Sequence, residues 1–443
     1  MGNGKSSRNV LEADARKAPR VREFPGTNVV PMKAKGSLVL TGSIHSLGRL
    51  ASSALIGALL VVPIVVDART AASQTQVREG AEPLLNKALD EIGKQRFDSA
   101  LSSIDQLLRV QPNFRLAHLI KGDLLLARVQ PLTQLGSASR GSEDRVGDLR
   151  EEAIARLRAL RDRPAEGQIP RYLLQMPADQ KYAVVVDTGR SRLYVFQNVG
   201  NRPQLVSDYY ISIGKRGAEK AREGDQKTPI GAYHVTASLP RKKLTDFYGS
   251  GAFPINYPNE WDKRMGRNGH GIWLHGTPSD TYSRPPRSSD GCVVLANGDL
   301  DALADNLQIG KTPVLISERI EWVSHDQVAS DRKEFLDSLE RWRSDWESKA
   351  TEKYLSHYSR QFSSADQNLS TWSANKKKIN ESKTWIKLSL SNISAVRSPG
   401  KEELVVVSFD QDYRSNNLNN HMRKMQYWVR EGGNWRIVYE GSA

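Results

Sequence analysis

The chain is almost without cysteine, since one residue, Cys292, stands among 443. An internal disulfide is therefore excluded. The sequence also lacks a long block of lysine and arginine, although its formal net charge is +14. Basic segments interleaved with aromatic residues mark nucleic-acid-binding proteins, so we expect no nucleic acid as a partner. No cluster of His, Asp and Glu has the spacing of metal ligands, and we expect neither a metal nor a cofactor.

Long apolar runs are also scarce, and the clearest is the uncharged 17-residue segment Leu50 to Val66. As a helix rising about 1.5 Å per residue it spans about 25 Å, enough for a thin bilayer. Residues 1–49 carry nine Lys and Arg against three acidic residues. This imbalance predicts a cytoplasmic tail and an exported remainder. A small-residue cleavage site, Val66-Asp67-Ala68, keeps a removed signal open beside the anchor over 50–66 that the long leader favours.

The predicted export makes the role of the single thiol of Cys292 a useful question. An unneeded exposed thiol is a liability in an oxidising compartment, because it is readily oxidised. Cys292 is therefore either a buried, inert residue or a reactive one, and its sequence neighbours bear on the choice.

Length predicts about three globular domains behind the leader. Residues 1–49 are polar, and we expect them to be disordered. Residues 76–165 have apolar residues at three- and four-residue steps, which predicts helices. Within them the segment Ala88 to Pro112 resembles one tetratricopeptide helix pair, and a plain helical stalk is the alternative. Either would serve as a spacer or a docking surface.

Residues 178–320 change to short strands with Gly- and Pro-rich connections, which predicts a mostly-β domain. A linker is predicted over 318–332. Residues 330–443 begin with an amphipathic helix, predicted over 334–362, and continue with four strands, the last two joined by the hairpin signal Glu431-Gly432-Gly433-Asn434. One long helix followed by an antiparallel sheet is an α+β domain. The strands expected in the mostly-β domain are 182–186, 193–196, 205–213, 231–235, 272–275, 292–295 and 314–316.

A strand ending on His275 and another beginning at Cys292 are separated by 16 residues, enough for a loop that brings imidazole and sulfur together. A thiol of ordinary pKa is only a few per cent thiolate near neutrality, so a nucleophilic cysteine needs a base or a cation beside it. Histidine can take that proton and return it to a leaving amine near pH 7. We therefore predict Cys292 as a nucleophile and His275 as its general base and acid.

The residues just before the cysteine, Ser289-Asp290-Gly291, predict a tight turn. The backbone N–H groups of Asp290 and Gly291, with that of Cys292, could point at a developing oxyanion. Gly291 would let the backbone approach a substrate carbonyl without a Cβ in the way. His270 lies five residues before His275, and this odd spacing on a strand points the two rings to opposite faces, which argues against a shared metal.

Residues 178–320 resemble the catalytic domain of L,D-transpeptidases of the YkuD type. The family's pattern is His-Gly, a spacer, and then Ser/Thr-His-Gly-Cys; it is matched by His275-Gly276 and by Ser289 to Cys292. Two further segments agree. GDQKTPIG at 224–231 is similar to the family's Thr-Pro-x-Gly segment, and FPINYPN at 253–259 is similar to the cap of one proteobacterial branch.

The resemblance implies a β-sandwich-like fold and a cysteine that attacks the peptide bond after meso-diaminopimelate in a peptidoglycan stem peptide. It also implies that the carbonyl of Gly276 orients the ring of His275. An enzyme of this kind would work in the cell envelope, at the periplasmic face of the inner membrane, or in the periplasm if the leader is cleaved. The side chains predicted to bind substrate are Tyr257, Arg264, His270 and Ser289, with Lys263 and Arg284 as further basic candidates.

The sequence departs from the family pattern at two places. Asp290 stands where the family has histidine, and Val293-Val294 follow the cysteine where an arginine is common. A carboxylate close to a thiol raises the thiol pKa unless it points away. The departure leaves the acyl acceptor open between an amine, which gives transpeptidation, and water, which gives carboxypeptidase or amidase action.

Residues 330–443 resemble the cone-shaped α+β fold of the nuclear-transport-factor-like (NTF2-like) superfamily. The resemblance is carried by the long helix, by FDQDYRS at 409–415 and by NWRI at 434–437. No acid–base pair is evident in this region, so we expect a non-catalytic domain. Together with the helical region, it could bind wall fragments or other cell-envelope proteins.

The main prediction is an exported peptidoglycan L,D-transpeptidase that crosslinks or remodels the cell wall. One alternative is an L,D-carboxypeptidase or amidase that hydrolyses wall peptide or protein–wall linkages. Another is a non-catalytic wall-binding scaffold, against which the retained pair of His275 and Cys292 argues.

Overall fold

A computed structural model of the protein describes residues 80–139, 141–364 and 367–443. The predicted cytoplasmic tail (1–49) and the predicted membrane segment (50–66) lie outside the described residues. Within those ranges, no helix combines the length and the apolar character that crossing a bilayer requires.

The first described segment forms four helices. They are α1 (Ala81–Gly93), α2 (Phe97–Val110), α3 (Arg115–Leu126) and α4 (Glu143–Arg161). Their apolar faces share a core that includes Leu85, Ile104, Leu107 and Ile120. These helices occur where the apolar periodicity predicts them. The likeness of α1 and α2 to a tetratricopeptide pair stays a prediction.

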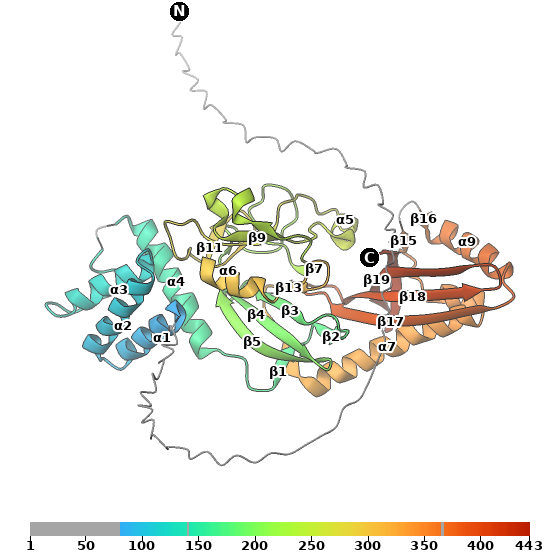
Figure 1. Ribbon diagram of the computed structural model, residues 1–443, viewed down its shortest axis with the longest axis horizontal. Helices are drawn as coiled ribbons and strands as arrows, with labels where there is room; N and C mark the ends of the chain where they lie inside the picture. The colour runs from blue at the N-terminus through green and yellow to red at the C-terminus, as the bar shows by residue number, and fades with distance from the viewer. Residues whose placement is uncertain (1–79, 140, 365–366) are drawn as a thin grey trace, which may run out of the picture. The chain divides into compact units, whose positions relative to one another are not determined.

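The second segment is rich in sheet and contains two main sheets (Figure 1). The first has the order β5-β4-β3-β13-β7, with β3 (Tyr182–Asp187), β4 (Arg192–Val199), β5 (Arg202–Tyr210), β7 (Gly231–His234) and β13 (Pro313–Ser317). The second has the order β12-β10-β9-β8, with β8 (Leu239–Pro240), β9 (Gly251–Pro254), β10 (Trp273–His275) and β12 (Val293–Val294).

Both sheets contribute to one hydrophobic core, in which Val184 and Val195 of the first lie with Phe253, Leu274 and Val293 of the second. Short elements connect the strands. They are β6 (Ile213–Gly214), which pairs with β11 (Arg287–Ser289), the 3₁₀ turns η1 (Arg241–Lys243) and η2 (Asp246–Tyr248), and the helices α5 (Glu260–Arg264) and α6 (Asn297–Ala304).

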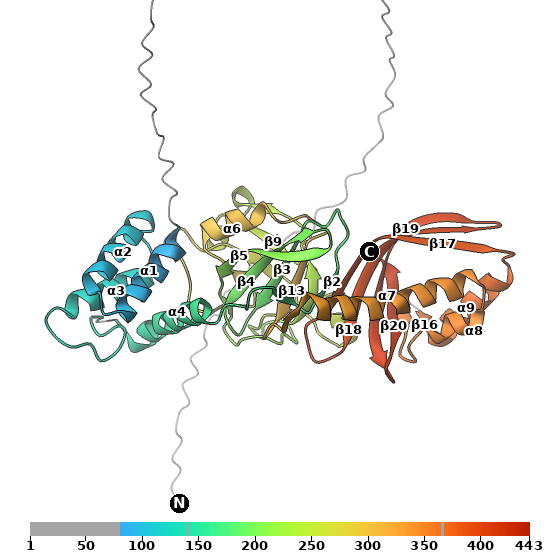
Figure 2. The same cartoon turned by 90° about the horizontal axis from the view of Figure 1, so that it is seen from below.

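The C-terminal segment is a curved antiparallel sheet covered by helices, and α7 runs along one face of that sheet (Figure 2). Its elements are α7 (His325–Glu347), α8 (Thr351–Ser356), β15 (Ser363–Ser364), β16 (Gln367–Asn368), α9 (Leu369–Glu381), β17 (Ile386–Arg397), β18 (Leu404–Ser415), β19 (Asn419–Glu431) and β20 (Asn434–Ser442).

Two predictions for this segment are wrong. The helix predicted over 334–362 is two helices, because Lys349 adopts a left-handed φ of 59° between them. The predicted linker 318–332 instead contains β14 (Trp322–Ser324) and the start of α7.

The start of α7 has a local cause that the apolar periodicity does not reveal. Ser324 is its N-cap, and the hydroxyl accepts a hydrogen bond from the Gln327 N–H (3.2 Å). The segment before the catalytic sheets also takes part in the C-terminal fold. Its strand β1 (Gln168–Pro170) pairs with β14, and β2 (Leu173–Gln175) adds a fifth strand next to β17.

Candidate active site

Strands β10 and β12 run parallel and pair Leu274 with Val293 and His275 with Val294. Side chains alternate between the two faces of a sheet, and paired residues share a face. Leu274 and Val293 therefore point together into the core. His275 lies on the opposite face with Val294, and Cys292 directly precedes β12. The sheet thus places the end of β10, which carries His275, beside the strand that directly follows Cys292.

The ring of His275 is buried and oriented by the backbone. Its Nδ1 lies 2.7 Å from the carbonyl oxygen of Gly276, a contact in which the ring nitrogen must be the donor. Nε2 is then the atom left with a lone pair. The rings of Phe247 and Tyr248 on η2 lie 5.8 Å and 5.2 Å from the imidazole centroid. Burial lowers the pKa of His275 to about 4; the Gly276 carbonyl opposes this shift and the Arg284 cation adds to it. The imidazole is therefore neutral at pH 7.

The thiol of Cys292 is half-buried, and its Sγ donates to the carbonyl oxygen of Gly271 (3.3 Å). Burial raises the pKa of this thiol to about 11, and the nearby Asp290 carboxylate contributes in the same direction. The Trp273 N–H and the Arg284 cation oppose the shift. The Cys292 thiol and the His275 imidazole are therefore both neutral at pH 7.

The turn before Cys292 is fixed by Ser289. Its buried hydroxyl donates to the Cys292 carbonyl (2.6 Å) and accepts from the Gly291 N–H (3.1 Å). Gly291 has a φ of 131°, and a Cβ there would lie 2.7 Å from the Lys227 carbonyl oxygen, so glycine is required. Because its N–H already donates to Ser289, the prediction that Gly291 lends this group to an oxyanion is not supported by the geometry. The matching role of the Asp290 N–H stays a prediction.

Thr228, in the segment that resembles the family's Thr-Pro-x-Gly motif, locks this turn to the neighbouring loop. Its hydroxyl donates to the Gly291 carbonyl (3.0 Å) and accepts from the Gly214 N–H (3.0 Å), and the residue has no exposed surface. Asp225, three residues earlier, accepts from the N–H groups of Ala221, Arg222 and Lys227. Through these hydrogen bonds the motif stabilises the turn that precedes Cys292.

The carboxylate of Asp290 contacts two polar side chains. Its Oδ1 accepts from Lys215 Nζ (3.0 Å) and from Gln226 Nε2 (3.1 Å), and its side chain is 69% exposed. The residue that replaces the family's histidine thus lies at the surface and is partly neutralised by a lysine.

Arg284, one of the further basic candidates, lies next to a ring that contacts His275. Its guanidinium carbon lies 4.6 Å from the centroid of the Phe247 ring, which in turn contacts His275. The backbone carbonyl of Arg284 accepts from the hydroxyls of Tyr210 and Ser212, both at 2.9 Å. The sequence offers Arg284 as one basic loop residue among several. The position of Arg284 depends on the path of its loop, which the spacing of residues in the sequence does not predict.

The predicted substrate-binding residues lie in different places. Tyr257 is in the core, and its hydroxyl donates to the Asn268 carbonyl (2.9 Å). Arg264 donates to Ser363 Oγ (2.6 Å) of the C-terminal domain. His270 is exposed, with Nε2 3.3 Å from Glu223 Oε1. Together with Ser289 in its turn, these three make intramolecular contacts, so their predicted role in binding substrate gains no support from these positions.

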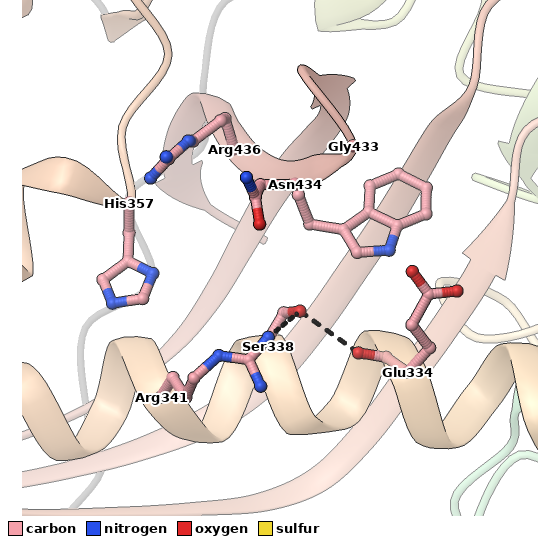
Figure 3. Close-up of a pocket in the computed structure, with 8 residues that line it drawn as sticks. Glu334, Ser338, Arg341, His357, Gly433, Asn434 and Arg436 are labelled. Atoms are coloured by element: carbon pink, nitrogen blue, oxygen red, sulfur yellow. Dashed lines mark hydrogen bonds between the residues drawn. The ribbon is translucent and has the colours of Figure 1, made fainter.

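A small cavity of about 170 Å³ in the C-terminal domain contains polar groups (Figure 3). Arg341 donates to Ser338 Oγ (2.8 Å) on one side, and His357 and Arg436 lie on the other. The Nε2 of His357 is 2.7 Å from Asp345 Oδ2. No group of three or more His, Cys, Asp and Glu side chains within the described ranges could hold a metal ion.

Comparison with known proteins agrees with this architecture. Residues 181–316 match the L,D-transpeptidase (YkuD) catalytic domain, and residues 334–441 match the Cds6 C-terminal NTF2-like domain. A search of curated proteins found no match. Among solved structures, Bd1075 of Bdellovibrio bacteriovorus is 32% identical with a TM-score of 0.56, over 62% of this chain and 98% of Bd1075. Pgp2 of Campylobacter jejuni, a helical cell shape determining protein, is 27% identical with a TM-score of 0.53, over 61% of this chain and 95% of Pgp2.

The fold and the site thus define a cysteine-dependent enzyme class with a peptidoglycan-related function. The chain belongs to the YkuD L,D-transpeptidase family and carries a C-terminal NTF2-like domain. Both resemblances predicted from the sequence are confirmed.

Proposed function

We propose that the protein is a peptidoglycan L,D-transpeptidase that forms a thioester on Cys292 with the meso-diaminopimelate of a stem tetrapeptide. The observation that best supports this is the parallel pairing of β10 and β12, which places the strand ending on His275 beside the strand that directly follows Cys292. The Gly276 contact, which leaves Nε2 of the imidazole free to accept a proton, supports it further.

The two pKa values suggest when the proton moves. A thiol with a pKa of about 11 and an imidazole with a pKa of about 4 do not form a stable ion pair at pH 7. The thiol first turns from the Gly271 carbonyl to the imidazole. Sulfur then attacks the peptide carbonyl carbon while Nε2 of His275 takes the thiol proton.

The tetrahedral intermediate collapses when the C–N bond breaks and His275 gives the proton to the leaving D-alanine amine. The thioester remains on Cys292. An acceptor amine next attacks the thioester carbonyl and loses a proton to Nε2. Return of this proton to the departing sulfur regenerates the thiol and releases the crosslinked peptide. Water in place of the amine gives the tripeptide instead.

The test is incubation of the protein with purified tetrapeptide-stem muropeptides, followed by mass spectrometry. We expect release of D-alanine and a thioester adduct on Cys292, both lost in the Cys292→Ala variant and reduced at least about 10²-fold in His275→Gln. Crosslinked dimers would demonstrate transfer, and free tripeptide would assign hydrolysis. Full turnover by Cys292→Ala would refute the proposal.

We further propose that the enzyme acts in the cell envelope, exported by the segment 50–66 and facing the periplasm. The charge imbalance around that segment supports this. Because Pgp2 is named as a helical cell shape determining protein, the reaction is expected to influence cell shape. A periplasmic reporter fused at the C-terminus should be active, and it should become inactive when residues 1–66 are removed.

A further inference from the structure

The helical region contacts one loop of the catalytic domain through ring packing and hydrogen bonds. This bridging loop, residues 276–286, connects β10, which carries His275, to β11 just before the cysteine turn. The Tyr282 ring packs against Phe114 at the start of α3, with centroids 4.5 Å apart. Tyr282 also lies at the edge of the hydrophobic core of the helices. The loop is thus anchored in a core that belongs to another domain.

Polar contacts extend this anchor along the loop. The Asn113 side chain donates to the Ser279 carbonyl (3.1 Å), and Arg115 lies 3.4 Å from Asp280. The hydroxyl of Ser283 donates to Glu152 on α4 (2.7 Å).

Glu152 is itself part of a buried arrangement of charges. Its carboxylate accepts from the guanidinium of Arg156 (2.8 Å), and both side chains are 1% exposed. The Arg156 guanidinium carbon lies 3.9 Å from the centroid of the Tyr210 ring of β5. Such a pair is costly to bury unless its hydrogen bonds are satisfied. Ser283 supplies one of those bonds, so loop and helix depend on each other.

The other side of the same loop contacts the active site. Asp246, the first residue of η2, accepts from the Ser279 N–H (3.1 Å) and hydroxyl (2.9 Å). The next two residues of η2, Phe247 and Tyr248, pack on His275. The loop also carries Arg284, which lies over Phe247. A chain of contacts therefore runs from α3 and α4, through the loop, to the catalytic imidazole.

We propose that the helical region contributes to the geometry of the active site. It holds the bridging loop against η2, and this contact keeps Arg284 in place and His275 buried. Phe114, Asn113 and Glu152 are then positioning residues for the reaction. This inference rests on the proposed role of His275 as the catalytic base. It gives the helices a function beyond that of a spacer.

Titration of His275 measures this coupling without a substrate. The imidazole contacts the Phe247 and Tyr248 rings from η2 and the Gly276 carbonyl, and the charge of Arg284 from the loop also acts on it. Burial and the arginine both lower the pKa of His275. Loosening the loop relieves both, so the pKa must rise toward the ordinary value of about 6.5.

The experiment uses the full chain labelled with ¹³C at histidine Cε1, in which the His275 resonance is assigned with the His275→Gln variant. Tyr282→Ala removes the ring that packs on Phe114, whereas Tyr282→Phe keeps it and is the matched control. On the helical side, the exposed double variant Asn113→Ala/Arg115→Ala breaks two loop contacts. Lys121→Ala, which breaks a pair with Asp105 (2.8 Å) within the helices, is its control.

We expect the pKa of His275 to rise by about one unit or more in Tyr282→Ala and in the Asn113/Arg115 double variant, with kcat falling roughly tenfold. The two control variants should titrate like the parent. Thermal melts verify that each variant is folded. If the double variant is folded and its His275 titrates like the parent, the proposal is wrong, and an equal rise in Lys121→Ala would also overturn it. If the pKa of His275 rises as expected but neither the parent nor any variant turns over stem peptides, the coupling of the helices to His275 stands and the proposed function fails.

Discussion

Thr228→Val is the substitution whose effect the structure defines most closely. Valine has nearly the shape of threonine, so the change removes one hydroxyl with little loss of packing. That hydroxyl joins Gly214 to Gly291, through hydrogen bonds of 3.0 Å on either side, in a position with no exposed surface. The variant leaves a buried N–H of Gly214 and a buried carbonyl of Gly291 without this partner.

A buried polar group that loses its partner costs about 1–3 kcal/mol. Two such groups predict a local loss of about 2–6 kcal/mol for the turn that carries Cys292. Since about 1.4 kcal/mol corresponds to a factor of ten, local opening should become about 30-fold or more frequent. We expect turnover to fall by at least about tenfold, because the nucleophile is no longer held in its attacking geometry.

Hydrogen–deuterium exchange followed by mass spectrometry measures this opening directly, in the peptides that contain Gly214 and residues 287–296. Thr236→Val is the matched control, because Thr236 Oγ1 also donates to a carbonyl, that of Pro254 (3.1 Å), but at an exposed position. Exchange in these peptides should accelerate in Thr228→Val and stay at the parent rate in Thr236→Val. Equal exchange in the two variants would show that Thr228 does not support the cysteine turn.

Three further outcomes follow from the same geometry. Gly291→Ala should abolish thioester formation, because its Cβ would lie 2.7 Å from the Lys227 carbonyl oxygen at a φ of 131°; wild-type adduct yields by mass spectrometry would contradict this. Asp290→Asn should speed alkylation of Cys292 at pH 8 by roughly two- to threefold, because the carboxylate raises the pKa of the thiol; a slower reaction would give the wrong sign. His275, with a pKa lowered to about 4 by burial, binds its proton less readily than the unfolded chain does. Stability should therefore decrease as the pH falls from about 6.5 to about 4, by about 3 kcal/mol in total, and chemical denaturation should show a weaker pH dependence in His275→Gln.

Much of the active site could be predicted from the sequence because it is local. His275-Gly276 and the turn from Ser289 to Cys292 are short segments whose roles depend on strand alternation and on glycine conformation. Ser289 shows the limit of this reasoning. Its hydroxyl was assigned to substrate, whereas the structure uses it to close the turn.

The parts that could not be predicted depend on long-range packing. Arg264 contacts residue 363 of another domain, and β2 joins a strand more than 200 residues further along the chain. Helix α9 (LSTWSANKKKINE) was missed because it has few apolar residues. Its capping box, in which Asn368 and Thr371 bond each other's backbone N–H groups, is the signal that could have revealed it. Apolar periodicity predicts elements that bury one regular face, and the Arg264 contact, β2 and α9 have no such face.

Asp290 can now be understood as a change at the surface of the site. The sequence places a carboxylate two residues before the nucleophile, which on its own would disfavour the thiolate. In the structure this carboxylate contacts Lys215 and Gln226 and is 69% exposed, so water and a lysine screen much of its charge. Strand β10, which ends on His275, pairs with β12, which directly follows Cys292. The departure from the family pattern therefore changes the charge at an exposed position near Cys292, and it leaves the pairing of β10 with β12 intact.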